Sequence, residues 1–207
     1  MYPNRVVAID FETLGLNYMY DVPTSLACVV FDDGEPTGEV FQSAIRPNPA
    51  KLKLSMEALN VQGSFIGADG KLNKTELFNA IEKIFPDDAD DTKNTMIRIA
   101  EWAKDVDAFN APCVAHRASF DLGFYDQHLA SFTSVYVSAL SPVWICTKTM
   151  SRAARLKGSS KFGLQETATL LGIQFDSQQG HDALYDATLC GKVYFGLIDA
   201  MRGLSES

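Results

Sequence analysis

The sequence predicts one α/β domain, residues 1–207, in which a mixed five-stranded sheet is flanked by helices. Three observations predict this class. The chain of 207 residues is long for one average domain but short for two. The segment up to residue 46 carries strand patterns separated by turn signals, and the remainder alternates helical periodicity with short apolar strands. Strands followed by alternating helices and strands are typical of helices packed on a mixed sheet.

Three strands are expected to open the domain as an antiparallel meander. Alternating and β-branched apolar residues mark the segments 5–13, 25–31 and 39–46. Asp33 and Gly34 form a two-residue hairpin signal between the second and third segments. Prolines at positions 47 and 49 end the third strand, because proline has no amide hydrogen for the ladder.

Helical periodicity dominates the rest of the chain. Two further apolar strands are expected at 111–116 and 142–146. Gly172 is expected to cap the end of a helix, and residues 87–92 to form a solvated acidic loop. The helices are expected at 74–85, 95–109, 120–129, 147–156, 164–171 and 182–201.

Composition excludes several classes of protein. Hydrophobic residues make up 46% and charged residues 21%, as in a soluble globular domain and unlike a collagen, a coiled coil or a disordered chain. The net charge of −8 argues against non-specific coating of duplex nucleic acid, but it permits a nucleic acid gripped locally. No apolar run approaches a membrane span, and Arg5 and Asp10 interrupt any signal sequence, so we expect a cytoplasmic protein with no membrane partner.

The cysteines and several common motifs give no site. Cys28, Cys113, Cys146 and Cys190 are widely separated without a CxxC pair, so free and largely buried thiols are expected. Cys113 and His116 form a lone CxxH that no second pair completes into a zinc site. The absence of GxGxxG, GK[ST] and GxSxG excludes a dinucleotide loop, a P-loop and an α/β-hydrolase elbow.

Two carboxylates stand out on the first predicted strand. Asp10 and Glu12 are two residues apart, so both point to the same face of the sheet, while Phe11 points to the other. Acidic side chains are unfavourable in such an apolar strand, and two adjacent ones repel. A divalent cation would neutralise the pair. The competing interpretation is a solvated strand end, because polar and glycine residues follow directly.

Three more chemically suggestive residues lie farther along the chain. Asp121 stands near the start of a predicted helix, where the helix dipole by itself favours an acid. His181 precedes the last predicted helix and, taken alone, reads equally well as a solvated loop residue. Asp186 lies beside the apolar stripe of that helix and should face the sheet, where a carboxylate needs a partner. The interpretation that a residue has no functional role is much weaker for all five positions together than for any one of them.

The order of these motifs resembles the DEDD exonuclease superfamily. AIDFETLG near the start, SFDLGFYDQHL in the middle and HDALYDA near the end resemble its DEDDh (DnaQ-like) branch, which includes the proofreading subunit of bacterial DNA polymerase III and ribonuclease T. The resemblance extends from Val6 to Tyr194. The tyrosine branch is disfavoured, because its tyrosine would stand where this chain has Asp182, and Tyr185 has the wrong spacing.

The resemblance implies a ribonuclease H-like fold, with three antiparallel strands followed by two parallel ones, and 3′–5′ exonuclease activity. It implies that four carboxylates, Asp10, Glu12, Asp121 and Asp186, bind two Mg²⁺ or Mn²⁺ ions, with Asp10 bridging them. His181 would be the general base. Two-metal catalysis suits this donor set, since carboxylate oxygens are the ligands that these ions prefer.

Two features indicate where the substrate lies, the first through the resemblance and the second through a run of cations. The turn at Thr13, Leu14 and Gly15 would receive the terminal nucleotide, with Leu14 packing on a base. Arg152 and Arg155 belong to a run of four cations in ten residues that could grip a backbone, although cations at a helix end also favour the dipole.

Several alternatives stay open at this stage. The expected partner is single-stranded nucleic acid with a free 3′ end, DNA favoured, and a DNA polymerase or another replication protein is a possible second partner. An RNA-trimming or oligoribonucleotide exonuclease and a non-catalytic, polymerase-associated binding module are the alternatives. Arg117, Cys146 and Asp182 depart from the usual pattern of the family, which leaves the details of substrate grip open.

Overall fold

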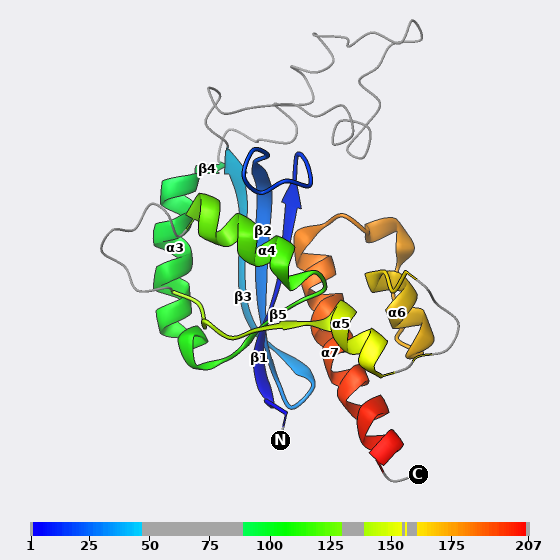
Figure 1. Cartoon of the computed structure of the whole chain (residues 1–207). Helices are drawn as coiled ribbons and strands as arrows, with labels where there is room; N and C mark the ends of the chain where they lie inside the picture. Colours follow the sequence, from blue (N-terminus) through cyan, green and yellow to red (C-terminus); the bar gives the residue numbers. More distant parts are fainter. Residues whose placement is uncertain (1, 47–88, 130–138, 155, 157–160, 206–207) are drawn as a thin grey trace, which may run out of the picture.

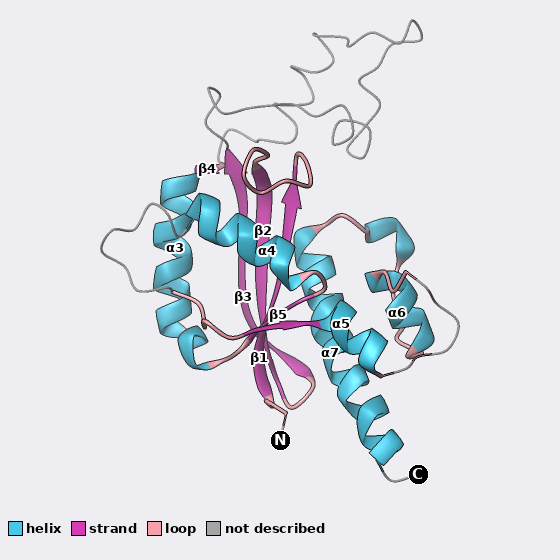
Figure 2. Cartoon of the chain, in the orientation of Figure 1, coloured by secondary structure: helices cyan, strands magenta, loops and turns pink. Residues whose placement is uncertain are grey.

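The computed structural model describes residues 2–46, 89–129, 139–154, 156 and 161–205. Figure 1 shows a twisted sheet with helices on both faces, and Figure 2 separates the helices from the strands by colour. The strand order across the sheet is β4-β3-β2-β1-β5-β6. The predicted mixed α/β class is therefore confirmed.

The first three strands form the predicted antiparallel meander. They are β1 (Arg5–Thr13), β2 (Pro23–Asp32) and β3 (Glu35–Arg46). Asp33 and Gly34 join β2 to β3 with φ angles of 48° and 94°. Two consecutive positive φ values match the right-handed twist of the strands in a tight hairpin, which confirms the turn predicted from Asp-Gly.

Two parallel strands extend the sheet beyond β1. They are β5 (Cys113–Ala115) and β6 (Trp144–Cys146), and each pairs in parallel with its neighbour. The predicted 111–116 and 142–146 segments are longer than these strands. Three antiparallel strands followed by two parallel ones agree with the arrangement expected for a ribonuclease H-like fold.

A sixth, two-residue strand occupies part of the segment expected to be a solvated acidic loop. In β4 (Asp90–Asp91) these residues pair in parallel with Ile45 and Arg46. The Asp90 carboxylate accepts a hydrogen bond from Arg98, and the Asp91 carboxylate caps the next helix by accepting the Asn94 amide at 2.8 Å. Charge-assisted and capping bonds therefore hold these two acids at the sheet edge, where the sequence pattern indicated only solvation.

Most of the predicted helices are present with shifted ends. None of the described helices is long and apolar enough to cross a membrane. The helix expected at 74–85 lies outside the described residues. The helices are α3 (Thr92–Asp105), α4 (Ala118–Phe124) continued by the π-helix η3 (Tyr125–Leu129), α5 (Thr147–Ala153), α6 (Leu164–Leu170) and α7 (Ala183–Ser205), with short 3₁₀ turns η2 (Ala108–Asn110) and η5 (Ser177–Gln179).

Gly172 ends α6 as predicted. Its φ of 71° is in the left-handed region, and its amide donates to the Thr169 carbonyl at 3.0 Å. The Ile173 amide reaches back to the Ala168 carbonyl at 2.9 Å. These two bonds are the Schellman pattern, which satisfies the last carbonyls of the helix and favours glycine at this position.

The sheet divides the core into two layers, and β1 contributes to both. Val7, Ile9 and Phe11 are buried against α3 and α4, whereas Val6 and Ala8 are buried against α7. Side chains alternate along a strand, so even-numbered residues of β1 face α7. The carboxylates at positions 10 and 12 continue the face that carries Val6 and Ala8.

A glycine allows α7 to lie close to β2. A Cβ added at Gly191 would stand 2.2 Å from the Phe31 ring, whereas one added at Gly203 would meet nothing within 4 Å. Gly191→Ala is therefore expected to destabilise the protein by about 1–3 kcal/mol through overpacking. Gly203→Ala in the same helix should be neutral or stabilising by up to about 1 kcal/mol, because alanine has the higher helix propensity. Urea unfolding of both variants measures the difference, and equal stabilities would contradict the packing argument.

The four cysteines are unpaired, as predicted. Cys28, Cys113 and Cys190 are buried, and Cys146 is half-buried. The two side chains of the lone CxxH contact different parts of the fold. The Cys113 thiol points to the Ser141 carbonyl, and the His116 ring nitrogens contact the Thr147 hydroxyl at 2.9 Å and the Phe162 carbonyl at 2.8 Å.

Candidate active site

The carboxyl end of β1 places two carboxylates on the α7 face of the sheet. Asp10 pairs with Ala27 of β2, and a bulge follows between Glu12 and Thr13. Phe11, between them, is 4% exposed and packs in the opposite layer. Strand alternation thus holds both acids on one face, as the sequence predicted.

Asp121 reaches the same place from the first turn of α4. This helix follows β5, which is paired in parallel with the middle of β1, so its first turn lies beyond the carboxyl end of β5 and beside the last residues of β1 (Figure 1). The Asp121 side chain is buried at 3% exposure. Burial raises its pKa to about 7, although a backbone hydrogen bond at Phe11 and the charge of Arg117 act in the opposite direction.

The start of α7 supplies His181 and Asp186. The His181 amide donates to Asp186 Oδ2 at 3.2 Å, and His181 has a left-handed φ of 72°. Asp182 caps the helix, because its carboxylate accepts the Tyr185 amide at 2.8 Å and its carbonyl accepts the Asp186 amide at 2.9 Å. The tight turn therefore directs the functional groups at positions 181 and 186 toward the end of β1.

The acids from these three regions form one cluster. One ligand atom from each of Glu12, His181 and Asp186 lies within 4.8 Å of the other two. Burial raises the pKa of Asp10 well above its ordinary value, and the charges of Asp121, Glu12 and Asp186 raise it further. Burial and the charge of Asp186 likewise raise the pKa of Glu12 to about 7. Because charges repel most strongly over short distances away from water, these shifts indicate that Asp10 and Asp121 lie near the group formed by Glu12, His181 and Asp186.

The cluster fits a divalent cation. Asp186 Oδ1 is buried and has no hydrogen-bond partner among the described residues. A buried carboxylate oxygen without a donor is costly, and converging carboxylates are the preferred ligands of Mg²⁺ and Mn²⁺. A bound cation would satisfy this oxygen and reverse the electrostatic reason for the raised pKa values.

Two charged residues near the cluster were not among the predicted site residues. The Asp182 carboxylate raises the pKa of Asp10, Glu12 and Asp186, although it is not the leading cause in any of them. The Arg117 charge lowers the pKa of Asp121. In the sequence, Arg117 and Asp182 stand out only because they depart from the usual pattern of the family. The neighbouring Tyr185 hydroxyl instead accepts a hydrogen bond from the Asp176 amide.

The predicted substrate turn is held by internal hydrogen bonds. Thr13 Oγ1 donates to the Gly15 carbonyl at 2.6 Å, and the Leu14 amide donates to the Val22 carbonyl at 2.9 Å. Leu14 is 1% exposed and Leu16 is 64% exposed. The structure thus differs from the expectation that Leu14 packs on a base, since the turn buries that side chain and presents Leu16.

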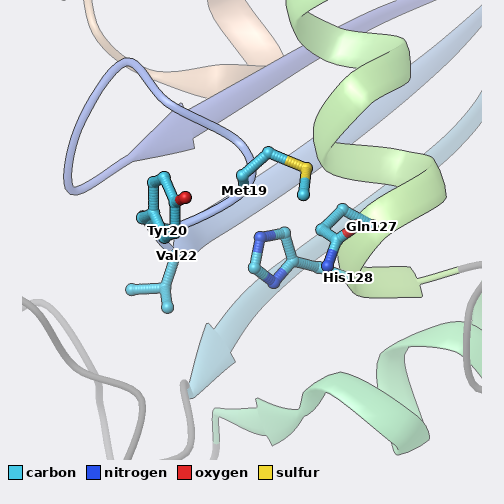
Figure 3. Close-up of a pocket in the computed structure, with 5 residues that line it drawn as sticks. All are labelled: Met19, Tyr20, Val22, Gln127 and His128. Atoms are coloured by element: carbon cyan, nitrogen blue, oxygen red, sulfur yellow. The ribbon is translucent and has the colours of Figure 1, made fainter.

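A small pocket separates the end of this loop from η3. Figure 3 shows His128 facing the loop that carries Met19 and Tyr20. The pocket volume is about 220 Å³, and its lining is Met19, Tyr20, Val22, Gln127 and His128. His128 Nε2 contacts the Tyr18 carbonyl at 2.8 Å, and its ring stacks on Phe124 with centroids 5.6 Å apart. These contacts anchor the loop after the DxE strand to the helix that carries Asp121.

The predicted backbone-gripping arginines are only partly described. Arg152 lies exposed in the last turn of α5. Arg155 falls outside the described residues, so its prediction stays untested.

Comparison with known proteins identifies the family. The sequence pattern of the exonuclease family, RNase_T, matches residues 74–194, which include Asp121, His181 and Asp186. DNA polymerase III PolC-type of Oceanobacillus iheyensis is 28% identical over 203 residues, which cover 97% of this chain and 12% of the polymerase. Ribonuclease T of Vibrio campbellii is 24% identical over 206 residues, which cover 96% of this chain and 87% of the relative. The chain thus spans a small part of the polymerase that it matches.

Solved structures share the fold. The nuclease domain of 3′hExo, a DEDDh family member bound to rAMP, has a TM-score of 0.62 at 16% identity, covering 96% of this chain and 93% of that domain. E. coli exonuclease I in complex with a dA16 oligonucleotide has a TM-score of 0.66 at 14% identity, covering 97% of this chain and 42% of that one. The matched family pattern and the shared ribonuclease H-like fold confirm the resemblance: this chain belongs to the exonuclease family.

Proposed function

We propose that the chain is a 3′–5′ exonuclease that removes terminal nucleotides from single-stranded nucleic acid, with DNA as the favoured substrate, by two-metal-ion catalysis. The observation that carries this proposal is the group of Glu12, His181 and Asp186, whose ligand atoms lie within 4.8 Å of one another, next to the buried Asp10 on which the charges of Asp121, Glu12 and Asp186 act. Membership of the exonuclease family supports hydrolysis of a phosphodiester bond.

The site residues divide the chemistry among them. The four carboxylates would hold two Mg²⁺ or Mn²⁺ ions, which when bound supply an activated water and stabilise the leaving oxygen. Asp121 is buried, and the backbone hydrogen bond at Phe11 constrains its carboxylate beside β1. Asp186 is oriented by the His181 amide and presents its unpartnered Oδ1 to the cluster. Strand and helix ends thus orient the ligands before a substrate arrives, which keeps the reorganisation cost low.

We propose that His181 accepts the proton of the attacking water. Its side chain is exposed at the rim of the cluster, and one ring nitrogen lies in the 4.8 Å group with carboxylate oxygens of Glu12 and Asp186. An imidazole nitrogen beside the cluster can accept a proton from a water molecule, which is the role of a general base.

Replacement of His181 by Ala is expected to slow turnover about 10²–10⁴-fold, the usual contribution of a general base. Binding of Mn²⁺, followed by calorimetry, should be largely retained, because the carboxylates remain. Tyr185→Phe is the matched control: its hydroxyl contacts the Asp176 amide, so most of the rate should be kept. Unchanged turnover of the His181 variant would reject the assignment.

The sugar of the substrate, deoxyribose or ribose, distinguishes the two candidate functions. The matched relatives include a ribonuclease T, and a solved structure of similar fold holds a dA16 oligonucleotide. An RNA-trimming exonuclease is therefore the second candidate, and contact with the 2′-hydroxyl would decide between the two. The similarity to part of a PolC-type polymerase supports a DNA polymerase as a possible partner.

A single digestion experiment tests the proposal. A 5′-labelled single-stranded DNA and the RNA of the same sequence are incubated with Mg²⁺, with Mn²⁺ and with EDTA. The expected result is a metal-dependent ladder that shortens from the 3′ end, faster on DNA. A faster RNA ladder would favour the second candidate, and no cleavage of either strand would contradict the proposal.

A further inference from the structure

Two cations lie at the same edge of the sheet as the acidic cluster. Ala115 of β5 pairs with Cys146 of β6 in parallel register. Arg117 and Lys148 each stand two residues beyond these paired positions. The carboxyl ends of parallel strands meet at one edge, so the chain positions that carry the two cations lie close to each other. The Lys148 amide also donates to the His116 carbonyl at 3.2 Å, which fixes the two segments together.

The charges of Arg117 and Lys148 affect the pKa values of neighbouring side chains. Burial lowers the pKa of His116 to about 4, and the charges of Lys148 and Arg117 contribute to the lowering. His116 is therefore neutral at physiological pH, and its ring nitrogens are engaged by Thr147 and Phe162. The Arg117 charge also acts on Asp121, so the Arg117 member of the pair adjoins the proposed metal site.

Neither cation is neutralised by a carboxylate within 4.0 Å in the described part of the chain. Ion pairs there involve Arg5, Arg98 and Arg202. Arg117 is exposed, and its guanidinium carbon lies 5.3 Å from the centroid of the Phe120 ring. Stacking on an aromatic face restricts the side chain while the guanidinium edge can still donate to an anion.

We propose that Arg117 and Lys148 form a phosphate-binding subsite for a phosphodiester of the substrate strand, on the 5′ side of the bond that is cleaved. This inference rests on the proposed function, since the strand must reach the acidic cluster. A chain of net charge −8 with clustered carboxylates repels a polyanion. A cationic pair beside the cluster offsets this repulsion and positions the strand.

Equilibrium binding tests the pair without catalysis. Arg117→Gln/Lys148→Gln is compared with Lys93→Gln/Lys104→Gln, which removes the same charge from exposed positions of α3. Fluorescence anisotropy of a 5′-labelled single-stranded DNA is followed in EDTA as the salt concentration is raised. The subsite variant should bind about 10-fold more weakly, and the slope of log K against log salt should fall by about 0.7, the value for loss of one phosphate contact on a single strand. The α3 variant should match the wild-type protein, and equal behaviour of both variants would overturn the proposal.

One uncharged linkage in the backbone of the oligonucleotide locates the phosphate that the subsite contacts. Oligonucleotides that carry one methylphosphonate at successive positions from the 3′ end are bound to both proteins. The wild-type protein should lose affinity at one internal linkage, and the subsite variant should lose nothing further there. Equal losses for both proteins at every linkage would overturn the inference. Cleavage by the wild-type protein, measured in parallel with Mg²⁺, separates this outcome from a failure of the proposed function, and thermal unfolding verifies that the variant is folded.

Discussion

Replacement of Asp10 by Asn is expected to lower kcat by about 1000-fold or more while raising the thermal stability of the metal-free protein. The loss follows because Asp10 is the carboxylate proposed to hold both metal ions. The gain follows because burial and like charges make the ionised form unfavourable, and an amide of the same shape removes that cost. Activity and stability should therefore move in opposite directions.

The gel ladder gives the rate of the Asp10 variant, and thermal unfolding in EDTA gives its stability. Asp105→Asn is the matched control, because Asp105 is exposed at the end of α3. This control should leave both quantities near their wild-type values. A stable but fully active Asp10 variant would remove that residue from the mechanism. An inactive variant with a lower Tm would show that Asp10 supports the fold instead.

The stability of the metal-free protein is expected to fall as the pH rises from 5.5 to 8. The pKa of Asp121 is raised from 3.8 to about 7, mainly by burial, and that of Glu12 from 4.5 to about 7. The folded state therefore binds more protons than the unfolded state between these values. This stabilisation is fully present below the unfolded pKa values and is lost as the pH passes through about 7. The expected loss is on the order of 2 kcal/mol, or about 4–8 °C in Tm.

A divalent ion should reverse this pH dependence. Protons and metal ions compete for the same carboxylates, so Mg²⁺ or Mn²⁺ should stabilise the protein more at pH 8 than at pH 5.5. At about 100 times Kd the added stability is about 2.7 kcal/mol. Differential scanning fluorimetry over pH, with metal and with EDTA, measures both effects, and Asp121→Asn should flatten the slope in EDTA. Metal-free stability that rises over this pH range would contradict the assigned electrostatics.

Local sequence patterns were sufficient for five of the six described strands and for the motif residues. Asp33 and Gly34 predicted the hairpin because two positive φ values are a local requirement, and Gly172 predicted the end of α6 for the same reason. Asp10 and Glu12 were placed on one face by strand alternation alone. The strand β4 was missed, because its pairing with β3 joins segments far apart in the chain.

The sequence by itself therefore determined the fold class, the family resemblance and the residues proposed to bind metal, since these follow from local periodicity and from motif order. Only the tertiary structure decided what surrounds them. It buried Leu14 and exposed Leu16, and it set Arg117 beside Asp121. It also brought Lys148 next to the segment that carries Arg117, because β5 and β6 are parallel neighbours. Charge and burial at such positions depend on contacts between distant segments, which no local pattern records.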